Sequence, residues 1–263
     1  LYHAFDRIKP SVARGLLMDS LPMTSEFARD LIRQGKLADK LQEFNRFERA
    51  AMNSTGGISY SQTHLSGKRR QRLRVARRRL DELGQVTFHE ASSAQDVEIA
   101  MLDFIFLESR GWKGKRNSAL ANDTNTRQFA MDVVRDLAMS GQCKVFSLQL
   151  DGAMIASMVM LISGGFYIPW KITFDERHAK NSVGNLLLVH VNDRVTQEKE
   201  FTFLDSVATG DNETANRFWP NKLKLCSLAI GFGKSGPQLA HYIARNLSVY
   251  GITKRRIRKI IES

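Results

Sequence analysis

The stretch from Lys144 to Phe174 reads KVFSLQLDGAMIASMVMLISGGFYIPWKITF, and it decides the fold class. Within it, three segments rich in apolar, β-branched and aromatic residues follow one another, at 144–150, 153–162 and 166–174. They are separated by Asp151-Gly152 and by Gly164-Gly165, dipeptides that favour tight hairpin turns. The stretch therefore predicts three consecutive antiparallel strands.

The sequence on either side of this stretch predicts helices and further strands. Before it we expect a strand at 85–90 and helices at 94–108 and 126–140. In the first helix, the inward face is expected to hold Val97, Met101, Phe104 and Leu107. In the second, it is expected to hold Phe129, Val133 and Leu137. After it we expect a helix at 185–197, a buried strand at 201–205, a short helix beyond Gly210 and a strand at 222–230. The order β-α-α-β-β-β-α-β-α-β predicts an α/β fold (an α+β mixed sheet) with helices on both faces.

The N-terminal part is less regular. Helices are predicted at 25–34 and 36–47, and the breaker cluster 53–57 follows them. A basic helix comes next, with Ser66 as its N-cap, Gly84 as its end, and one apolar stripe. That stripe consists of Leu73, Ala76, Leu80 and Leu83. Near the C-terminus, Pro237 marks the first turn of a long helix, and a basic helix is expected at 254–261.

The positive charge of the chain is concentrated in two places. The 263 residues hold 39 Lys and Arg against 27 Asp and Glu, a formal net charge of +12. Five of the cations lie at 254–259, and eight more lie within twelve residues of the basic helix. These eight are Lys68, Arg69, Arg70, Arg72, Arg74, Arg77, Arg78 and Arg79. The remaining chain is nearly neutral, so the charge describes two patches. The patch on the helix is either a solvated face or a docking surface for tRNA, an anionic membrane or a polysaccharide.

Several classes of protein are disfavoured by what the sequence contains. Cys143 and Cys226 are isolated, which fits a reducing cytoplasm, and Cys143 is expected to be a core residue rather than a nucleophile. The histidines lack the spacing of a metal site, so no metal is expected. No apolar run is long enough to predict a transmembrane segment. The run Gly231–Gly236 has the pattern G-x-G-x-x-G, but the chain after it is too short for a dinucleotide fold, which favours a turn.

A candidate anion site lies between the third strand of the meander and the helix at 185–197. Ser182 and Gly184 are small enough for a phosphate to approach the N–H groups of a helix N-terminus, and Arg177 and Lys180 add positive charge. The alternative is structural: Asn181 or Ser182 caps the helix, and Gly184 eases a tight turn.

Several motifs, in the right order, resemble one family of transferases. Leu107–Gly114 resembles the "LE..GWKG" segment of the acetyltransferases named for cellulose biosynthesis (CelD-like), and Trp170–Leu187 resembles their "WK..YDE…SPG.LL" run. The basic helix from Leu65 resembles the helix before their catalytic domain, and Leu204-Asp205 with Gly210 their "DF…G" segment. This group has the GNAT N-acyltransferase fold and is related to FemAB-type transferases, which contain two GNAT-like halves.

The resemblance implies a division of the chain. Residues 1–65 would be part of a first GNAT-like half, and 66–84 a basic linking helix. Residues 85–236 would form the acyltransferase domain, and 237–263 a C-terminal helix and basic tail. Because the chain starts at Leu1, a fragment is also expected.

The resemblance also implies a function: transfer of an acetyl or acyl group from acetyl-CoA or another acyl-CoA to an amine or hydroxyl acceptor in envelope or polysaccharide biology. The expected co-substrate site is Arg177, Lys180, Asn181, Ser182, Val183, Gly184 and Asn185. Asp205 or Asp175 would bind the acceptor amine or move its proton, Lys171 would bind an anionic group, and Trp112 would line the substrate pocket. Alternatives are a structural Lys171–Asp175 pair and core packing of Trp112.

The sequence departs from the wider superfamily at two places. The run Ala179–Gly184 differs from the usual [RQ]-x-x-G-x-[GA], and no tyrosine stands where a general acid is expected after Gly210. The alternative functions are a FemAB-like transferase that uses aminoacyl-tRNA and a non-enzymatic relative that binds nucleic acid.

Overall fold

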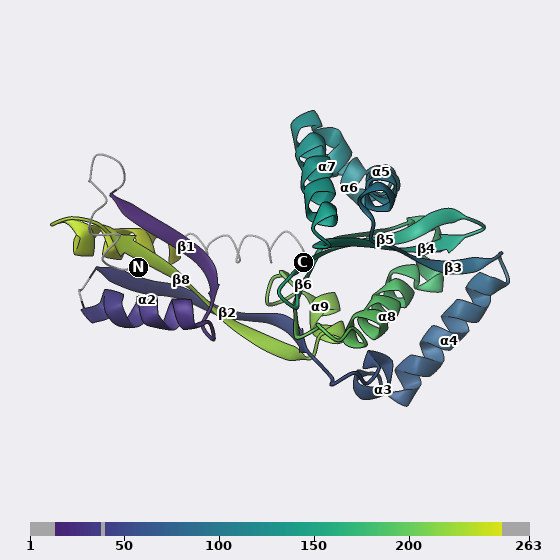
Figure 1. Ribbon diagram of the computed structural model, residues 1–263, viewed down its shortest axis with the longest axis horizontal. Coiled ribbons are helices and arrows are strands. Elements are labelled where there is room, and N and C mark those ends of the chain that lie inside the picture. Colours follow the sequence, from purple (N-terminus) through teal and green to yellow (C-terminus); the bar gives the residue numbers. More distant parts are fainter. Residues whose placement is uncertain (1–13, 38–39, 249–263) are drawn as a thin grey trace. The chain divides into compact units, whose positions relative to one another are not determined.

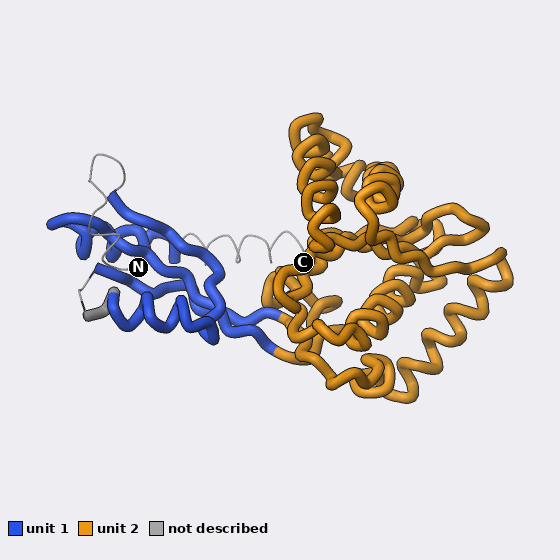
Figure 2. The backbone as a smooth tube through the Cα atoms, in the orientation of Figure 1, with its two compact units in different colours: residues 1–49, 222–263 blue, residues 50–221 orange. Residues whose placement is uncertain are grey.

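The computed structural model describes residues 14–37 and 40–248 (Figure 1). The chain forms two compact units, which are coloured separately in Figure 2: residues 1–49 with 222–263, and residues 50–221. The bounds of these two units differ from the domain bounds expected from the sequence. That residues 1–65 are part of a first GNAT-like half therefore stays a prediction. The predicted tail helix at 254–261 lies outside the described residues.

The larger unit, residues 50–221, alternates helices and strands largely as the sequence predicts. Its strands are β3 (Val86–Ala91), β4 (Cys143–Leu150), β5 (Ala153–Ser163), β6 (Phe166–Phe174) and β7 (Phe203–Asp205). Its helices are α3 (Tyr60–His64), α4 (Gly67–Asp81), α5 (Ala94–Arg110), α6 (Trp112–Lys115), α7 (Thr124–Met139), α8 (Val183–Thr196) and α9 (Glu213–Phe218). Two 3-10 turns, η1 (Leu120–Asn122) and η2 (Glu176–Asn181), complete it.

The sheet of this unit has the order β7-β6-β5-β4-β3. The pairs β3–β4, β4–β5 and β5–β6 are antiparallel, and β6–β7 is parallel. Both predicted hairpin turns are confirmed by left-handed backbone angles: φ is 49° at Asp151 and 78° at Gly152, then 55° at Gly164 and 82° at Gly165. The meander and the mixed α/β sheet are as predicted.

Helices cover both faces of this sheet (Figure 1). On one face, α5 and α7 pack on β4 and β5 around Phe104, Val134 and Val159. On the other face, α4 and α8 pack around Leu80, Leu187 and further side chains of the sheet. A polar network also ties the sheet to α8, because Lys144 lies 2.9 Å from Glu90 and 2.8 Å from Glu198, and Arg194 lies 3.0 Å from Glu90.

The predicted inward face of α5 is confirmed, since Val97, Met101, Phe104 and Leu107 are buried. The predicted face of α7 is wrong at Phe129, whereas Leu137 is partly buried against the core as expected. Phe129 is 63% exposed, and the helix instead buries Ala130, Met131, Val134 and Ala138. These side chains share one core cluster with the buried face of α5. The apolar stripe of α4 also ends one turn early, because Leu83 is 57% exposed beyond the helix end.

The smaller unit contains β1 (Gly15–Pro22), α2 (Glu26–Leu37), the first part of β2 (Leu41–Asn53), most of β8 (Asn221–Gly231) and a helical segment at 236–248. Strand β8 lies between β1 and β2. The predicted helix at 36–47 is wrong from Leu41 onward, because pairing with β8 overrides the local helical pattern.

The glycine-rich run 231–236 forms the predicted turn. A Cβ on Gly231 would lie 1.9 Å from the carbonyl oxygen of Gly236, and φ is 72° at Gly233. The glycines therefore serve a close backbone approach at the end of β8.

Candidate active site

A cavity of about 480 Å³ opens where β6 and β7 separate. Only two residue pairs, Phe166–Phe203 and Tyr167–Leu204, form the parallel ladder, whereas β6 continues to Phe174. The register between β5 and β6 also shifts, because Val159 faces Lys171 while Met160 faces Pro169. The shift leaves Trp170 without an opposing residue, and such a bulge bends the strand.

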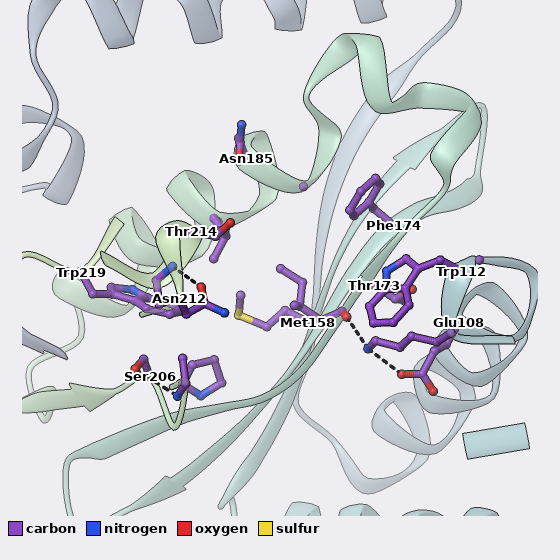
Figure 3. Close-up of a pocket in the computed structure, with 18 residues that line it drawn as sticks. Glu108, Trp112, Met158, Thr173, Phe174, Asn185, Ser206, Asn212, Thr214 and Trp219 are labelled. Atoms are coloured by element: carbon purple, nitrogen blue, oxygen red, sulfur yellow. Dashed lines mark hydrogen bonds and ion pairs between the residues drawn. The ribbon is translucent and has the colours of Figure 1, made fainter. Parts of the chain in front are cut away.

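The cavity is lined by five parts of the larger unit (Figure 3). These are the end of α5 with α6, strands β5 and β6, the start of α8, the segment after β7, and α9. Their lining residues are Glu108, Gly111, Trp112, Lys113, Met158, Pro169, Ile172, Thr173, Phe174, Gly184, Asn185, Leu188, Ser206, Ala208, Asn212, Thr214, Ala215 and Trp219.

Most of the lining side chains are apolar, and a few polar groups stand among them. The indole N–H of Trp219 donates to Asn192 Oδ1 at 3.1 Å, which fixes the orientation of that ring. The side chains of Thr173, Asn185 and Thr214 have no hydrogen-bond partner among the residues that the structure describes. An apolar pocket with a few unpaired polar groups is typical of a small-molecule site.

A buried carboxylate forms one wall. The side chain of Glu108 is fully buried, and its Oε2 accepts a hydrogen bond from the N–H of Leu120 at 2.8 Å. Its Oε1 lies 2.8 Å from Lys113 Nζ and 3.8 Å from Lys171 Nζ. The Lys113 ammonium also donates to the carbonyl of Ile172 at 3.1 Å. This group, Glu108 with Lys113 and Lys171, is called the Glu108 cluster below.

Sequence reasoning missed Glu108 and Lys113 as site residues, although a signal was present. Glu108 follows Val97, Met101 and Phe104 on the inward face of α5, where an apolar side chain is expected. A carboxylate in such a position must be paired or hydrogen-bonded, because burying it alone is costly. Its partners could not be identified from the sequence, since they come from α6, η1 and β6.

The start of α8 borders the cavity, as the predicted co-substrate site requires. Ser182 has a left-handed backbone (φ 52°), and its side chain makes no capping hydrogen bond to the helix. Gly184 and Asn185 line the cavity, and a Cβ on Gly184 would lie 3.4 Å from the ring of Phe174. Ser182 therefore stands at the N-cap position of α8 but makes no side-chain hydrogen bond to the helix. Val183 follows Ser182 and is fully buried in the core beside this turn.

Arg177, Lys180 and Asn181 lie in η2 or at its end, and none of them lines the cavity. The guanidinium of Arg177 binds the Asp175 carboxylate, with Nη2 2.6 Å from Oδ2. Hydrogen bonds from Arg177 hold the pKa of Asp175 below its usual value, and the carboxylate raises the pKa of Arg177 in return. Asp175 therefore pairs with Arg177, whereas Lys171 pairs with Glu108. The Lys171–Asp175 pair considered from the sequence does not form.

The other predicted site residues fall close to the cavity. Trp112 lines it, is 49% exposed and has the Arg116 guanidinium over its ring at 5.5 Å, so it is not packed in the core. Asp205 ends β7 beside the lining residue Ser206, and its Oδ1 accepts a hydrogen bond from Val207 N–H at 3.0 Å. Asp205 itself is not among the lining residues.

Cys143 is fully buried, and burial raises the pKa of its thiol to about 11, so it is a core residue as expected. No tyrosine is among the residues that line the cavity. In the described ranges, no three His, Cys, Asp or Glu side chains are grouped so that they could hold a metal ion. The same ranges contain no helix with the length and hydropathy needed to cross a bilayer.

The basic helix is α4, and the N–H of Arg69 donates to its predicted cap, Ser66 Oγ, at 3.4 Å. Arg69 donates to the carbonyl of Arg217 at 3.2 Å, and two less exposed arginines of the helix are structural. Arg70 donates to the carbonyls of Ser61 and Leu65, and Arg77 binds Asp81 and the carbonyl of Val86. The cations that remain exposed are Lys68, Arg69, Arg72, Arg74, Arg78 and Arg79.

The comparisons with known proteins identify the family. Residues 67–214 match the model of the acetyltransferase (GNAT) domain, and the chain therefore belongs to the GNAT acetyltransferase family. No curated protein sequence matches this one.

Three solved structures illustrate the shared fold. The first is the C-terminal domain of a protein named as a lysylphosphatidylglycerol synthetase from Agrobacterium fabrum (14% identity, TM-score 0.56, covering 91% of this chain and 75% of that one). The second is L-PGS from Bacillus licheniformis (13% identity, TM-score 0.54, 90% and 74%). The third is FemX (9% identity, TM-score 0.57, 82% and 72%). At these identities the similarity concerns the fold.

Proposed function

We propose that this protein transfers an acyl group from acyl-CoA to an amine or hydroxyl acceptor, and that the reaction takes place in the cavity between β6 and β7. The observation that carries the proposal is the position of that cavity. The cavity lies at the start of α8. The N–H groups at this end of the helix are not capped by the side chain of Ser182. A GNAT-family chain with a pocket at this position has room for both substrates beside an anion-binding helix end.

The donor would enter at α8. The pyrophosphate of acyl-CoA would lie against the N–H groups of Val183, Gly184 and Asn185, where the positive end of the helix dipole favours negative charge. Lys180, which is exposed, and the amide of Asn181 lie just before this turn. Both can contact phosphate groups of the bound CoA. Arg177 would act indirectly, because its guanidinium is bound to Asp175.

The chemistry would be direct transfer. The acceptor nitrogen or oxygen attacks the thioester carbonyl, its bond to carbon forms while the carbon–sulfur bond breaks, and the acceptor proton passes to a base as the thiolate leaves. Asp205 is the better placed of the two predicted bases, since it directly precedes Ser206 in the cavity wall. Asp175 is held by Arg177, and a carboxylate with a lowered pKa is a weaker base.

The resemblance of Leu107–Gly114 and Trp170–Leu187 to the CelD-like acetyltransferases supports an acceptor of the cell envelope or a polysaccharide. Acetyl-CoA is the simplest donor consistent with that group.

Calorimetric titration of the full chain with CoA and acetyl-CoA tests the proposal. Wild-type protein should bind both, and Gly184→Leu should lose binding, because a side chain there meets Phe174 and fills the donor channel. Gly67→Leu is the matched control, since Gly67 opens α4 with free space around it and should keep wild-type affinity. Absence of CoA binding in the wild type contradicts the proposal.

A second candidate is an aminoacyl-tRNA-using transferase or a nucleic-acid-binding relative, and the exposed cations of α4 favour it. Phosphate contacts from these side chains would give binding that falls steeply with salt. The quadruple change of Lys68, Arg72, Arg74 and Arg79 to Gln should abolish tRNA retention at low salt. Arg70 and Arg77 should be left intact, because they hold α4 in place. Retention that is insensitive to salt or to these changes contradicts this reading.

A further inference from the structure

A second cavity, of about 340 Å³, lies on the face of the sheet that carries α5, opposite the face that carries α8 (Figure 1). Its lining residues come from α5 and from strands β3, β4 and β5. No described residue lines both this cavity and the candidate active site. The second cavity is called the α5 cavity below, and its walls combine acidic, neutral polar and apolar side chains.

Two carboxylates of α5 line the α5 cavity, and neither forms an ion pair within the described ranges. Asp103 is exposed and has no hydrogen-bond partner in those ranges. Asp96 accepts a hydrogen bond from Ser93 Oγ at 2.6 Å, but only through Oδ2. Although the chain has a net charge of +12, this cavity is therefore bordered by negative charge that no basic side chain neutralises.

A buried hydroxyl also faces the α5 cavity. Ser147 of β4 is only 3% exposed and lines the cavity, yet its hydroxyl has no hydrogen-bond partner among the residues that the structure describes. It stands opposite His89 of β3 in the antiparallel register, and His89 lines the cavity as well. Since buried hydroxyl groups are normally hydrogen-bonded, the unpaired Ser147 favours a polar ligand group at this wall.

The spacing of the acids indicates the shape of the ligand. Asp96 and Asp103 are seven residues apart, so they lie on the same side of α5, about 10 Å from each other along its axis. This is too far for both to bind one metal ion, whose oxygen ligands lie at about 2.0–2.6 Å. Between them the helix presents Ile99 and Ala100 to the cavity, and Met154 of β5 adds a further apolar side chain. A chain of methylene groups with a positive charge toward each end matches this arrangement.

We propose that the α5 cavity binds a linear aliphatic amine that carries two or more ammonium groups, the chemistry of a polyamine. The carboxylates of Asp96 and Asp103 would each accept hydrogen bonds from one ammonium group, and such charge-assisted bonds are stronger than neutral ones. The methylene chain would pack against Ile99 and Met154, and a ligand N–H would donate to Ser147. The site shares no lining residue with the candidate active site, so the inference does not depend on the proposed function.

Calorimetric titration of the full chain with spermidine, a linear polyamine, tests the proposal. Propylamine, which carries a single ammonium group, should bind at least about tenfold more weakly, because it reaches only one carboxylate. Asp103→Asn should weaken spermidine binding about tenfold for the same reason. Asp136→Asn is the matched control and should keep wild-type affinity, because Asp136 is an exposed carboxylate of α7 that does not line the cavity.

An amine could also enter the candidate active site as an acyl acceptor, so Asp205→Asn is titrated beside Asp103→Asn. Binding that is lost in Asp205→Asn but kept in Asp103→Asn would place spermidine in the active site and overturn the inference. The inference is also wrong if wild-type protein does not bind spermidine, if propylamine binds equally well, or if Asp136→Asn weakens binding as much as Asp103→Asn. CoA binding should be unchanged in Asp103→Asn, and the CoA titration decides the proposed function separately.

Discussion

Glu108 illustrates how a single residue organises the wall of the cavity. It ends the apolar face of α5, yet its carboxylate is fully buried, and its two oxygens hold α6 through Lys113 and η1 through Leu120. Such a group is tolerated only because each oxygen has a partner. The same contacts fix Lys113 in the wall of the cavity, and Lys171 lies 3.8 Å from the carboxylate as a second cation.

Replacing Glu108 by Leu should be costly. The change leaves the Leu120 N–H unpaired and Lys113 and Lys171 facing each other without a counterion, so we expect a loss of about 3 kcal/mol in the free energy of unfolding. Urea denaturation measures it. Glu98→Leu on the same helix is the control, because its pairing with Arg135 is solvent-exposed and its loss should matter far less. Equal effects of the two changes would show that Glu108 is not a structural anchor.

Trp112 allows a second residue-scale prediction. Trp112 lines the cavity and about half of the residue is exposed, so Trp112→Ala should leave stability nearly unchanged but weaken acceptor use. Trp219 is the contrast, since it is buried and hydrogen-bonded to Asn192, and Trp219→Ala should cost about 3 kcal/mol or more in unfolding free energy. Unfolding curves and initial rates for the two variants separate these roles.

At the scale of elements, the packing of α8 on β3 makes stability depend on pH. His190 of α8 stacks on Phe88 of β3 with ring centroids 3.9 Å apart, and burial lowers its pKa, aided by Arg194. Because the folded state then binds a proton less readily than the unfolded state, stability should fall as the pH falls below about 6.5.

Urea midpoints measured at pH 7.5 and 5.5 check this dependence. The wild-type midpoint should drop on acidification, and His190→Leu should show a smaller drop. His89→Leu provides the control, because His89 is an exposed residue of β3 itself. Glu90 acts in the same direction at lower pH: although burial opposes ionisation, Lys144 and Arg194 lower its pKa, and that contribution is lost as the carboxyl is protonated. An unchanged drop in His190→Leu would contradict the assignment to His190.

Elements defined by local signals were predictable from the sequence, and those defined by distant partners were not. The strands from Lys144 to Phe174 carry their own turn residues, and their φ values at Asp151 and Gly164 match. Strand β2 has no such signal, because its neighbour β8 lies more than 160 residues away in the chain. The Glu108 cluster could not be predicted, for the same reason. The short loop before Gly184 predicted an anion site at the start of α8, and that site stays a prediction.

At the scale of the whole molecule, residues 50–221 behave as a unit inserted between two parts of another. The family match at 67–214 and every residue that lines the cavity lie within it. Its two ends are also joined, since the N–H of Asn53 donates to Asn221 Oδ1 at 3.0 Å. A unit whose ends meet and that has its own core meets the usual conditions for independent folding.

Residues 50–221 expressed alone should therefore fold cooperatively and bind CoA within about threefold of the full chain, because no lining residue is lost. Thermal unfolding and calorimetric titration measure the two properties. The strand ends exposed by the cuts, at Ala50 and Asn221, are expected to lower stability without altering the pocket. Gly184→Leu in the same fragment should abolish CoA binding, which shows that binding by the fragment uses the cavity. A fragment that folds but does not bind CoA, while the full chain does, would place part of the donor site in the smaller unit.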